Sequence, residues 1–182
     1  MITKNGLTYL LERSLSKRIL FSRHAKSSWG NLGTSDQDRS LSQEGVDSAH
    51  LMGSRLLKNN ILPDFFMSSS AKRALDTCKI IKNEVNVDGE IQIFKQIYTD
   101  GLDGIVSSIQ LADNQYNFIA IFGHNPTMHQ IYNNISNTYL SKFPTSALFV
   151  CSFNSKRWKS FSLSNLEIKI YDYPKNIKYN FK

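Results

Sequence analysis

The run Phe118–Phe122 constrains the fold more than any other stretch of the chain. Its sequence is Phe-Ile-Ala-Ile-Phe, five apolar residues in succession. Such a run favours a central parallel strand that is covered on both faces. It ends in Gly123-His124-Asn125-Pro126, where Gly123 permits close backbone approach and Pro126 suits the first turn of a helix. The run therefore predicts a core strand that gives way to a loop and a helix at His124.

A second short apolar run, Ile19–Phe21, leads directly into Ser22-Arg23-His24. It is typical of a buried parallel strand, although periodicity alone does not exclude a helix. Open α/β sheets bind ligands where the chain leaves the carboxyl ends of parallel strands. A guanidinium suits phosphate, and a neighbouring imidazole can serve as nucleophile, base or hydrogen-bond donor. His24 and His124 thus occupy equivalent positions at two strand ends.

Strand and helix patterns alternate along the rest of the chain. Ser42 is a plausible N-cap for the helix that follows it. Residues 97–101 are expected to form a turn, and Arg157-Trp158 resembles a hairpin tip. This alternation predicts a three-layer α/β/α sandwich with a mostly parallel sheet. Further strands are expected at 64–68, 91–95, 146–153 and 161–171, and helices at 43–59, 71–85, 102–112 and after Pro126.

We expect residues 17–182 to form a single domain. Residues 1–16 form an N-terminal extension whose leucines have the spacing of one helical face.

Arg73 would lie in the first turn of the helix predicted at 71–85, where serines can cap the helix. A positive charge is unfavourable there, because the helix dipole has its positive end at the N-terminus. A bound phosphate would remove the conflict, since helix N-termini and arginines both bind anions. A solvated surface arginine is the alternative.

Composition excludes several classes of protein. The 182 residues carry a formal net charge of +7, which favours solubility or acidic partners such as phosphorylated proteins. The basic residues near the C-terminus match no nucleic-acid motif, so we expect no nucleic-acid binding. No stretch is long enough to cross a bilayer, and the first residues lack a secretory signal, so we expect a cytoplasmic protein without a membrane partner. Cys78 and Cys151 are the only cysteines, which excludes a disulfide scaffold and a four-cysteine metal site.

Four separate motifs, in order and spacing, resemble the histidine phosphatase superfamily with its phosphoglycerate-mutase-like fold, and most closely the SixA-like phosphohistidine phosphatases. The resemblance covers about residues 17 to 165. Its four motifs are Arg23-His24-Ala25-Lys26-Ser27-Ser28-Trp29, Asp38-Arg39-Ser40-Leu41-Ser42-Gln43-Glu44-Gly45, Pro63-Asp64 with Ser68-Ser69-Ser70-Ala71-Lys72-Arg73-Ala74 and Thr77, and Gly123-His124-Asn125-Pro126. Pro144-Thr145-Ser146-Ala147 and Trp158 also fit. The family usually has proline where this chain has Ser40 and Ser70, which affects loop geometry only.

The resemblance implies a phosphatase that needs no metal or other cofactor. His24 would be the nucleophile that forms a phosphohistidine intermediate, and Arg23, Arg73 and a protonated His124 would bind the phosphoryl group. Basic surroundings would keep the attacking nitrogen of His24 unprotonated.

Larger members of the superfamily place a glutamate near the third strand end as proton donor, and this chain has none there. Asp100 is the possible substitute, although a turn aspartate is more often a local cap. An alkoxide leaving group gains about 10²–10⁴-fold from a general acid, whereas imidazole, with a conjugate-acid pKa of about 6.5, leaves with less help. The missing acid therefore favours phosphohistidine on a protein, such as a histidine-containing phosphotransfer domain. A small-molecule phosphomonoesterase and a non-catalytic phosphate-binding module stay open as alternatives.

Lys26, Ser27 and Asn125 are three further candidate donors near the site. Ser27 and Asn125 are candidate phosphate donors, with loop stabilisation an equal alternative for Ser27. Asp38 and Arg39 are expected to form a structural ion pair at the mouth of the site.

Overall fold

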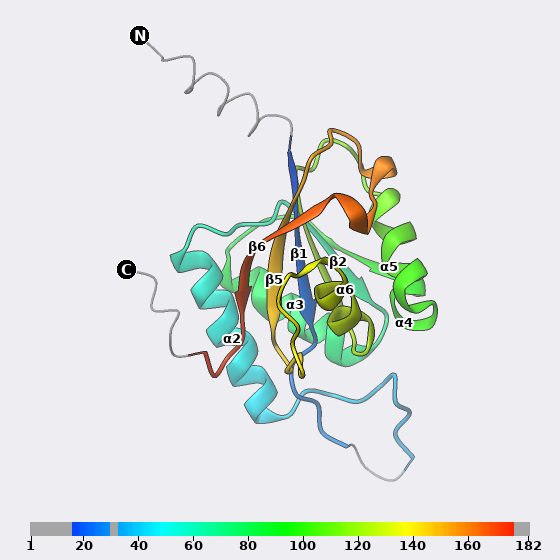
Figure 1. Ribbon diagram of the computed structural model, residues 1–182. Helices are drawn as coiled ribbons and strands as arrows, with labels where there is room; N and C mark the ends of the chain where they lie inside the picture. The colour runs from blue at the N-terminus through cyan, green and yellow to red at the C-terminus, as the bar shows by residue number, and fades with distance from the viewer. Residues whose placement is uncertain (1–15, 30–32, 177–182) are drawn as a thin grey trace.

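A computed structural model describes residues 16–29 and 33–176 of the chain. Its centre is a six-stranded sheet with the order β3-β2-β4-β1-β5-β6 (Figure 1). The pairs β1·β4, β2·β4 and β2·β3 are parallel, and β5 and β6 extend the sheet in antiparallel fashion. The sheet is therefore mostly parallel, as predicted. The strands are β1 (Lys17–Arg23), β2 (Phe65–Ser69), β3 (Ile91–Phe94), β4 (Phe118–Gly123), β5 (Leu148–Phe153) and β6 (Leu166–Asp172).

Strand β4 lies inside the sheet, and all six of its residues are buried. Its last residue, Gly123, pairs with Arg23 at the end of β1. On its other side, Phe122 pairs with Ser68 near the end of β2. Because the three strands are parallel, the loops that follow them leave the sheet at one edge.

Five helices cover the two faces of the sheet (Figure 1). One face packs against α2 (Gln43–Lys58) and α3 (Lys72–Glu84) through a cluster that includes Leu20, Ala120 and Met52. The opposite face packs against α5 (Gly101–Gln110) and α6 (Thr127–Ile135) through a second cluster, which also includes a residue of the short helix α4 (Gln96–Thr99). Alternate residues of β1 and β4 enter the two clusters, because successive side chains of a strand point to opposite faces. The three-layer α/β/α prediction is confirmed.

Two local predictions are wrong. Residues 97–101 do not form a simple turn, because Gln96–Thr99 is the short helix α4 and α5 begins at Gly101. Arg157-Trp158 does lie between the antiparallel strands β5 and β6, but it is not a tight hairpin tip. Trp158 is 0% exposed, and its indole N–H donates to the carbonyl of Tyr116 at 2.9 Å. The β5–β6 connection instead contains two 3-10 helices, Trp158–Ser160 and Leu163–Asn165, so β6 begins only at Leu166.

The predicted helical character of residues 1–16 falls almost wholly outside the described part of the chain. Within that part, no helix has both the length and the apolar character needed to cross a membrane.

Candidate active site

Four side chains from three separate parts of the chain meet at the carboxyl edge of the sheet. Arg23 ends β1 and His24 follows it, Arg73 lies in the first turn of α3, and His124 follows β4. The two imidazole rings have their centroids 5.1 Å apart. Arg73 Nε lies 3.3 Å from His24 Nε2. The structure thus brings together the histidines and arginines that the sequence indicated.

The hydrogen bonds of His24 fix which ring nitrogen carries the proton. Nδ1 lies 2.7 Å from the carbonyl oxygen of Ala25, and a carbonyl only accepts, so Nδ1 is the protonated nitrogen. In the neutral ring Nε2 therefore keeps its lone pair. The donor contact from Arg73 Nε to this nitrogen agrees with that assignment.

Three buried polar atoms around the histidines have no hydrogen-bond partner. They are Nε of Arg23, Nδ1 of His124 and Oδ1 of Asn125. An unpaired buried polar group costs roughly 1–3 kcal/mol and needs an explanation. Two of the three are nitrogens of cationic or protonatable side chains, so an anion in the site would satisfy them.

Hydrogen bonds to neighbouring residues fix the positions of the His124 and Arg23 side chains. His124 Nε2 lies 2.8 Å from Ser69 Oγ, and Arg23 Nη1 donates to the carbonyl of Phe143 at 2.6 Å. Ser69 Oγ also accepts from Ala71 N, so this serine links His124 to the start of α3. The N-cap residue of α3 is Ala71, not a serine as predicted.

Burial is the main influence on the protonation of both histidines. Burial, assisted by the nearby arginines Arg73 and Arg23, lowers the pKa of His24 to about 4. Burial and the proximity of His24 lower the pKa of His124 to about 3. The unprotonated state expected for His24 agrees with this direction. The protonated state expected for His124 does not, because the desolvation of its ring outweighs the proximity of Asp36. A phosphate dianion brings negative charge to these rings and would raise both pKa values.

Asp36 and Tyr98 are the residues of the site that the sequence did not indicate. Arg73 is 7% exposed, so it is not a solvated surface arginine. Its Nη1 donates to the main-chain oxygen of Asp36 at 2.5 Å, and its Nη2 to Oδ2 of the same residue at 3.0 Å. Tyr98 O–H donates to the same Oδ2 at 2.8 Å, and its ring meets the His124 ring edge-on at a centroid distance of 5.4 Å.

No motif or periodicity separates Asp36 from the other polar residues of its loop. Its role becomes visible only because the loop folds back over α3.

The remaining candidates lie at the margin of this cluster. Ser27 Oγ accepts from Arg39 Nη2 at 2.9 Å, which fits the loop-stabilising alternative. Asn125 Nδ2 donates to the carbonyl of Phe143 at 3.0 Å. Asp100 is exposed at the junction of α4 and α5. The predicted pairing of Asp38 with Arg39 is wrong: Arg39 Nη1 pairs with Asp36 at 3.1 Å.

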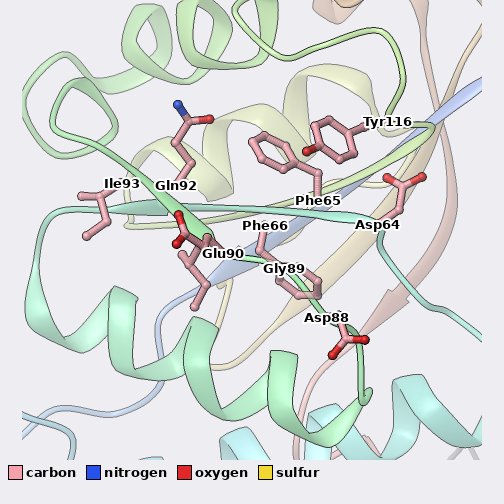
Figure 2. Close-up of a pocket in the computed structure, with 10 residues that line it drawn as sticks. Asp64, Phe65, Phe66, Asp88, Gly89, Glu90, Gln92, Ile93 and Tyr116 are labelled. Carbon is pink, nitrogen blue, oxygen red and sulfur yellow. The ribbon is translucent and has the colours of Figure 1, made fainter.

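A separate hollow of about 740 Å³ lies at the opposite ends of the strands, near the amino ends of β2 and β3. Figure 2 shows Phe65 and Tyr116, whose rings stack at 4.3 Å, together with the carboxylates of Asp64, Asp88 and Glu90. A hollow lined by carboxylates repels phosphate, whereas the histidine and arginine cluster attracts it. Across residues 16–29 and 33–176, no three or more histidine, cysteine or acidic side chains come close enough to hold a metal ion.

Comparisons with known proteins agree with this geometry. The model of the histidine phosphatase superfamily (branch 1) matches residues 19–97, the segment that contains Arg23, His24 and Arg73. SixA from Agrobacterium tumefaciens has the same fold, with a TM-score of 0.71 over 86% of this chain and 97% of that one, at 24% identity. Over residues 19–97 the chain thus resembles the histidine phosphatase superfamily.

Two further proteins are similar to this chain. An uncharacterised chloroplast protein of Arabidopsis thaliana is 27% identical over 162 residues, which are 83% of this chain and 73% of that protein. A structure of the protein histidine phosphatase SixA in complex with tungstate has a TM-score of 0.72 at 18% identity, over 86% of this chain and 97% of that one. The match to the histidine phosphatase superfamily model supports a phosphatase activity.

Proposed function

We propose that the protein is a metal-independent phosphatase that removes phosphate from phosphohistidine on a protein, with His24 as nucleophile. The observation that carries the proposal is the lone pair on His24 Nε2, which faces the guanidinium of Arg73 beside unpaired buried nitrogens of Arg23 and His124. A nucleophile surrounded by preorganised donors is what phosphoryl transfer requires. A structure with the same fold, the protein histidine phosphatase SixA, was determined in complex with the oxyanion tungstate, which supports an oxyanion as the kind of ligand.

The reaction runs in two steps. His24 Nε2 attacks phosphorus and forms a P–N bond, while the bond from phosphorus to the substrate imidazole breaks and its electron pair stays on that imidazole. A substrate ring protonated on its other nitrogen leaves as neutral imidazole. Water then forms the P–O bond while the P–Nε2 bond breaks and its electron pair returns to Nε2. Both protons of the water leave on inorganic phosphate, as H2PO4−. Arg23, Arg73 and a His124 protonated in the presence of phosphate stabilise the charge on the transferring group.

The acidic groups near the site favour a phosphoramidate over a phosphoester. Hydrogen bonds from Tyr98, Arg39 and Arg73 lower the pKa of Asp36 to about 2, so it is ionised at neutral pH and has no proton to give. Asp100 is exposed rather than held against the histidines. A leaving alkoxide needs such a proton far more than a leaving imidazole does.

The test is to trap the phosphorylated enzyme with a labelled phosphohistidine donor and to map the label. We expect the label on His24, and we expect His24→Ala to abolish both label and turnover. His50→Ala is the matched control, because His50 is an exposed histidine that bonds Glu84 and lies outside the site. Label on another residue, or full turnover by the His24→Ala variant, would contradict the proposal.

A substrate panel tests the substrate class separately. We expect phosphohistidine to be hydrolysed with a kcat/KM about 10² times that of aliphatic phosphomonoesters, because the latter depend far more on a general acid. Equal turnover of both would favour the small-molecule phosphomonoesterase and refute the argument from the missing acid.

A further inference from the structure

A second pocket, of about 250 Å³, adjoins the candidate active site. Three of its lining residues are lysines and one is a glutamate. Its walls are Lys26, Glu44 and Ser48, then Lys142, Pro144 and Thr145, and then Tyr173, Pro174 and Lys175. None of these residues belongs to the cluster proposed to carry out the chemistry.

Main-chain contacts join this basic pocket to the catalytic cluster. Lys26 follows His24 by two residues. The carbonyl of Phe143, between Lys142 and Pro144, accepts from Arg23 Nη1. The amide of Ser146 donates to the carbonyl of His24 at 3.2 Å. A substrate group held in the pocket would therefore lie beside the phosphoryl group on His24.

The segment Tyr173-Pro174-Lys175 follows β6 and leaves the sheet on the same side as the candidate active site. Hydrogen bonds hold this segment in place. Asp172, the last residue of β6, pairs with Leu148, which in turn pairs with Ser22 of β1. In Figure 1 the end of β6 lies next to α2. Arg55 of α2 bonds the buried carboxylate of Asp172 at 3.1 Å and the carbonyls of Tyr173 and Pro174. These bonds fix the segment that carries Lys175.

Charge and size indicate what the pocket accepts. Lys26 and Lys175 both act on Glu44, whose pKa is lowered mainly by its bond to Lys26. Among the described residues, Lys142 has no ion-pair partner, so positive charge is in excess. A volume of about 250 Å³ is below the usual range for a whole small ligand. It fits one or two side chains that run along Pro144, Pro174 and the ring of Tyr173.

We propose that this basic pocket binds acidic side chains that flank the phosphorylated histidine of a protein substrate. The inference rests on the proposed function and adds a sequence preference to it. Complementary charges on the two sides of an interface increase the association rate and disfavour partners of the wrong charge.

The experiment compares two phosphohistidine peptides, one flanked by glutamates and one by glutamines at the same positions. We expect the glutamate peptide to have the higher kcat/KM, and the advantage to shrink as salt screens the charges. The double substitution Lys142→Glu with Lys175→Glu should lower kcat/KM for the glutamate peptide about tenfold and leave the glutamine peptide nearly unchanged.

Lys156→Glu with Lys159→Glu is the matched control. It makes the same change in net charge, but it lies beyond Phe153, which pairs with Lys17 at the opposite edge of the sheet. We expect it to affect neither peptide. Equal turnover of both peptides, or an equal loss in both double variants, would overturn the inference and leave the proposed function standing. No turnover of either peptide by the unaltered protein would instead contradict the proposed function.

Discussion

At the residue scale, Asp36 is the unexpected neighbour of the candidate phosphate site. Its carboxylate accepts hydrogen bonds from Arg73 Nη2 and from the Tyr98 hydroxyl. Its main-chain oxygen accepts a hydrogen bond from Arg73 Nη1. A phosphate that binds Arg73 must therefore approach a negative charge. Asp36 both orients the guanidinium and opposes the anion that the guanidinium attracts.

We predict that Asp36→Asn strengthens phosphate binding. Removing one like charge near the anion lowers the repulsion by about 1 kcal/mol or more, so the inhibition constant for inorganic phosphate should fall about tenfold. Competitive inhibition assays measure this constant. Asp38→Asn is the control, because Asp38 is exposed in the same loop and bonds Ser35. Weaker phosphate binding in Asp36→Asn would mean that orientation of Arg73 outweighs repulsion.

At the scale of the elements, the N-terminus of α2 is built against the loop that follows His24. Ser42 caps the helix by accepting from the amide of Gly45, and both the amide and the hydroxyl of Ser42 donate to the carbonyl of Lys26. A Cβ on Gly45 would lie 2.0 Å from that carbonyl oxygen. Only glycine lets helix and loop approach this closely, so this contact positions the residues that follow the nucleophile.

We predict that Gly45→Ala destabilises the fold by about 1–3 kcal/mol, the usual cost of overpacking a tight contact. The backbone of Lys26 must move to admit the methyl group, so phosphatase activity should fall as well. Denaturant unfolding and an activity assay measure the two effects. Leu51→Ala, at an exposed position of the same helix, should change stability by less than about 0.5 kcal/mol. An unaltered midpoint in Gly45→Ala would refute the packing argument.

For the whole molecule, two partly buried neutral histidines link stability to pH. The pKa of His24 is about 4 and that of His124 about 3, both below the ordinary value of 6.5. In the unfolded chain these rings bind protons below about pH 6.5, whereas the folded protein excludes the protons until lower pH. Stability is therefore fully present above about pH 6.5 and is lost as the pH falls toward the folded pKa values.

We predict that the free energy of unfolding falls as the pH drops from about 6.5 toward about 4, with a limiting slope of about 1.4 kcal/mol per pH unit for each histidine. Denaturant titrations at a series of pH values measure the slope. The double variant His24→Asn with His124→Asn should show a much flatter dependence. A slope that persists in the double variant would place the pH sensitivity elsewhere.

Much of the fold was predictable because hydrophobic patterning is local. The alternation of apolar runs and amphipathic helices predicted the mostly parallel sheet and its layers, and the fully buried β4 came from one apolar run. The sequence did not predict the burial of Trp158, because an aromatic residue between basic ones is also typical of a turn. Its burial depends on contacts with Tyr116 and other residues distant in the chain. The short helix α4 was missed because four residues are too few to display a helical period.

The sequence by itself determined the types of group available to the site: two histidines and two arginines, each placed at the end of a strand or the start of a helix. Only the tertiary structure decided how those groups interact. The bond to the carbonyl of Ala25 determines which nitrogen of His24 is unprotonated, and burial makes both rings neutral. Folding of a distant loop brings Asp36 onto Arg73, and three chain segments form the basic pocket. Proton positions and desolvation depend on distances between residues far apart in the chain, and a linear pattern does not record those distances.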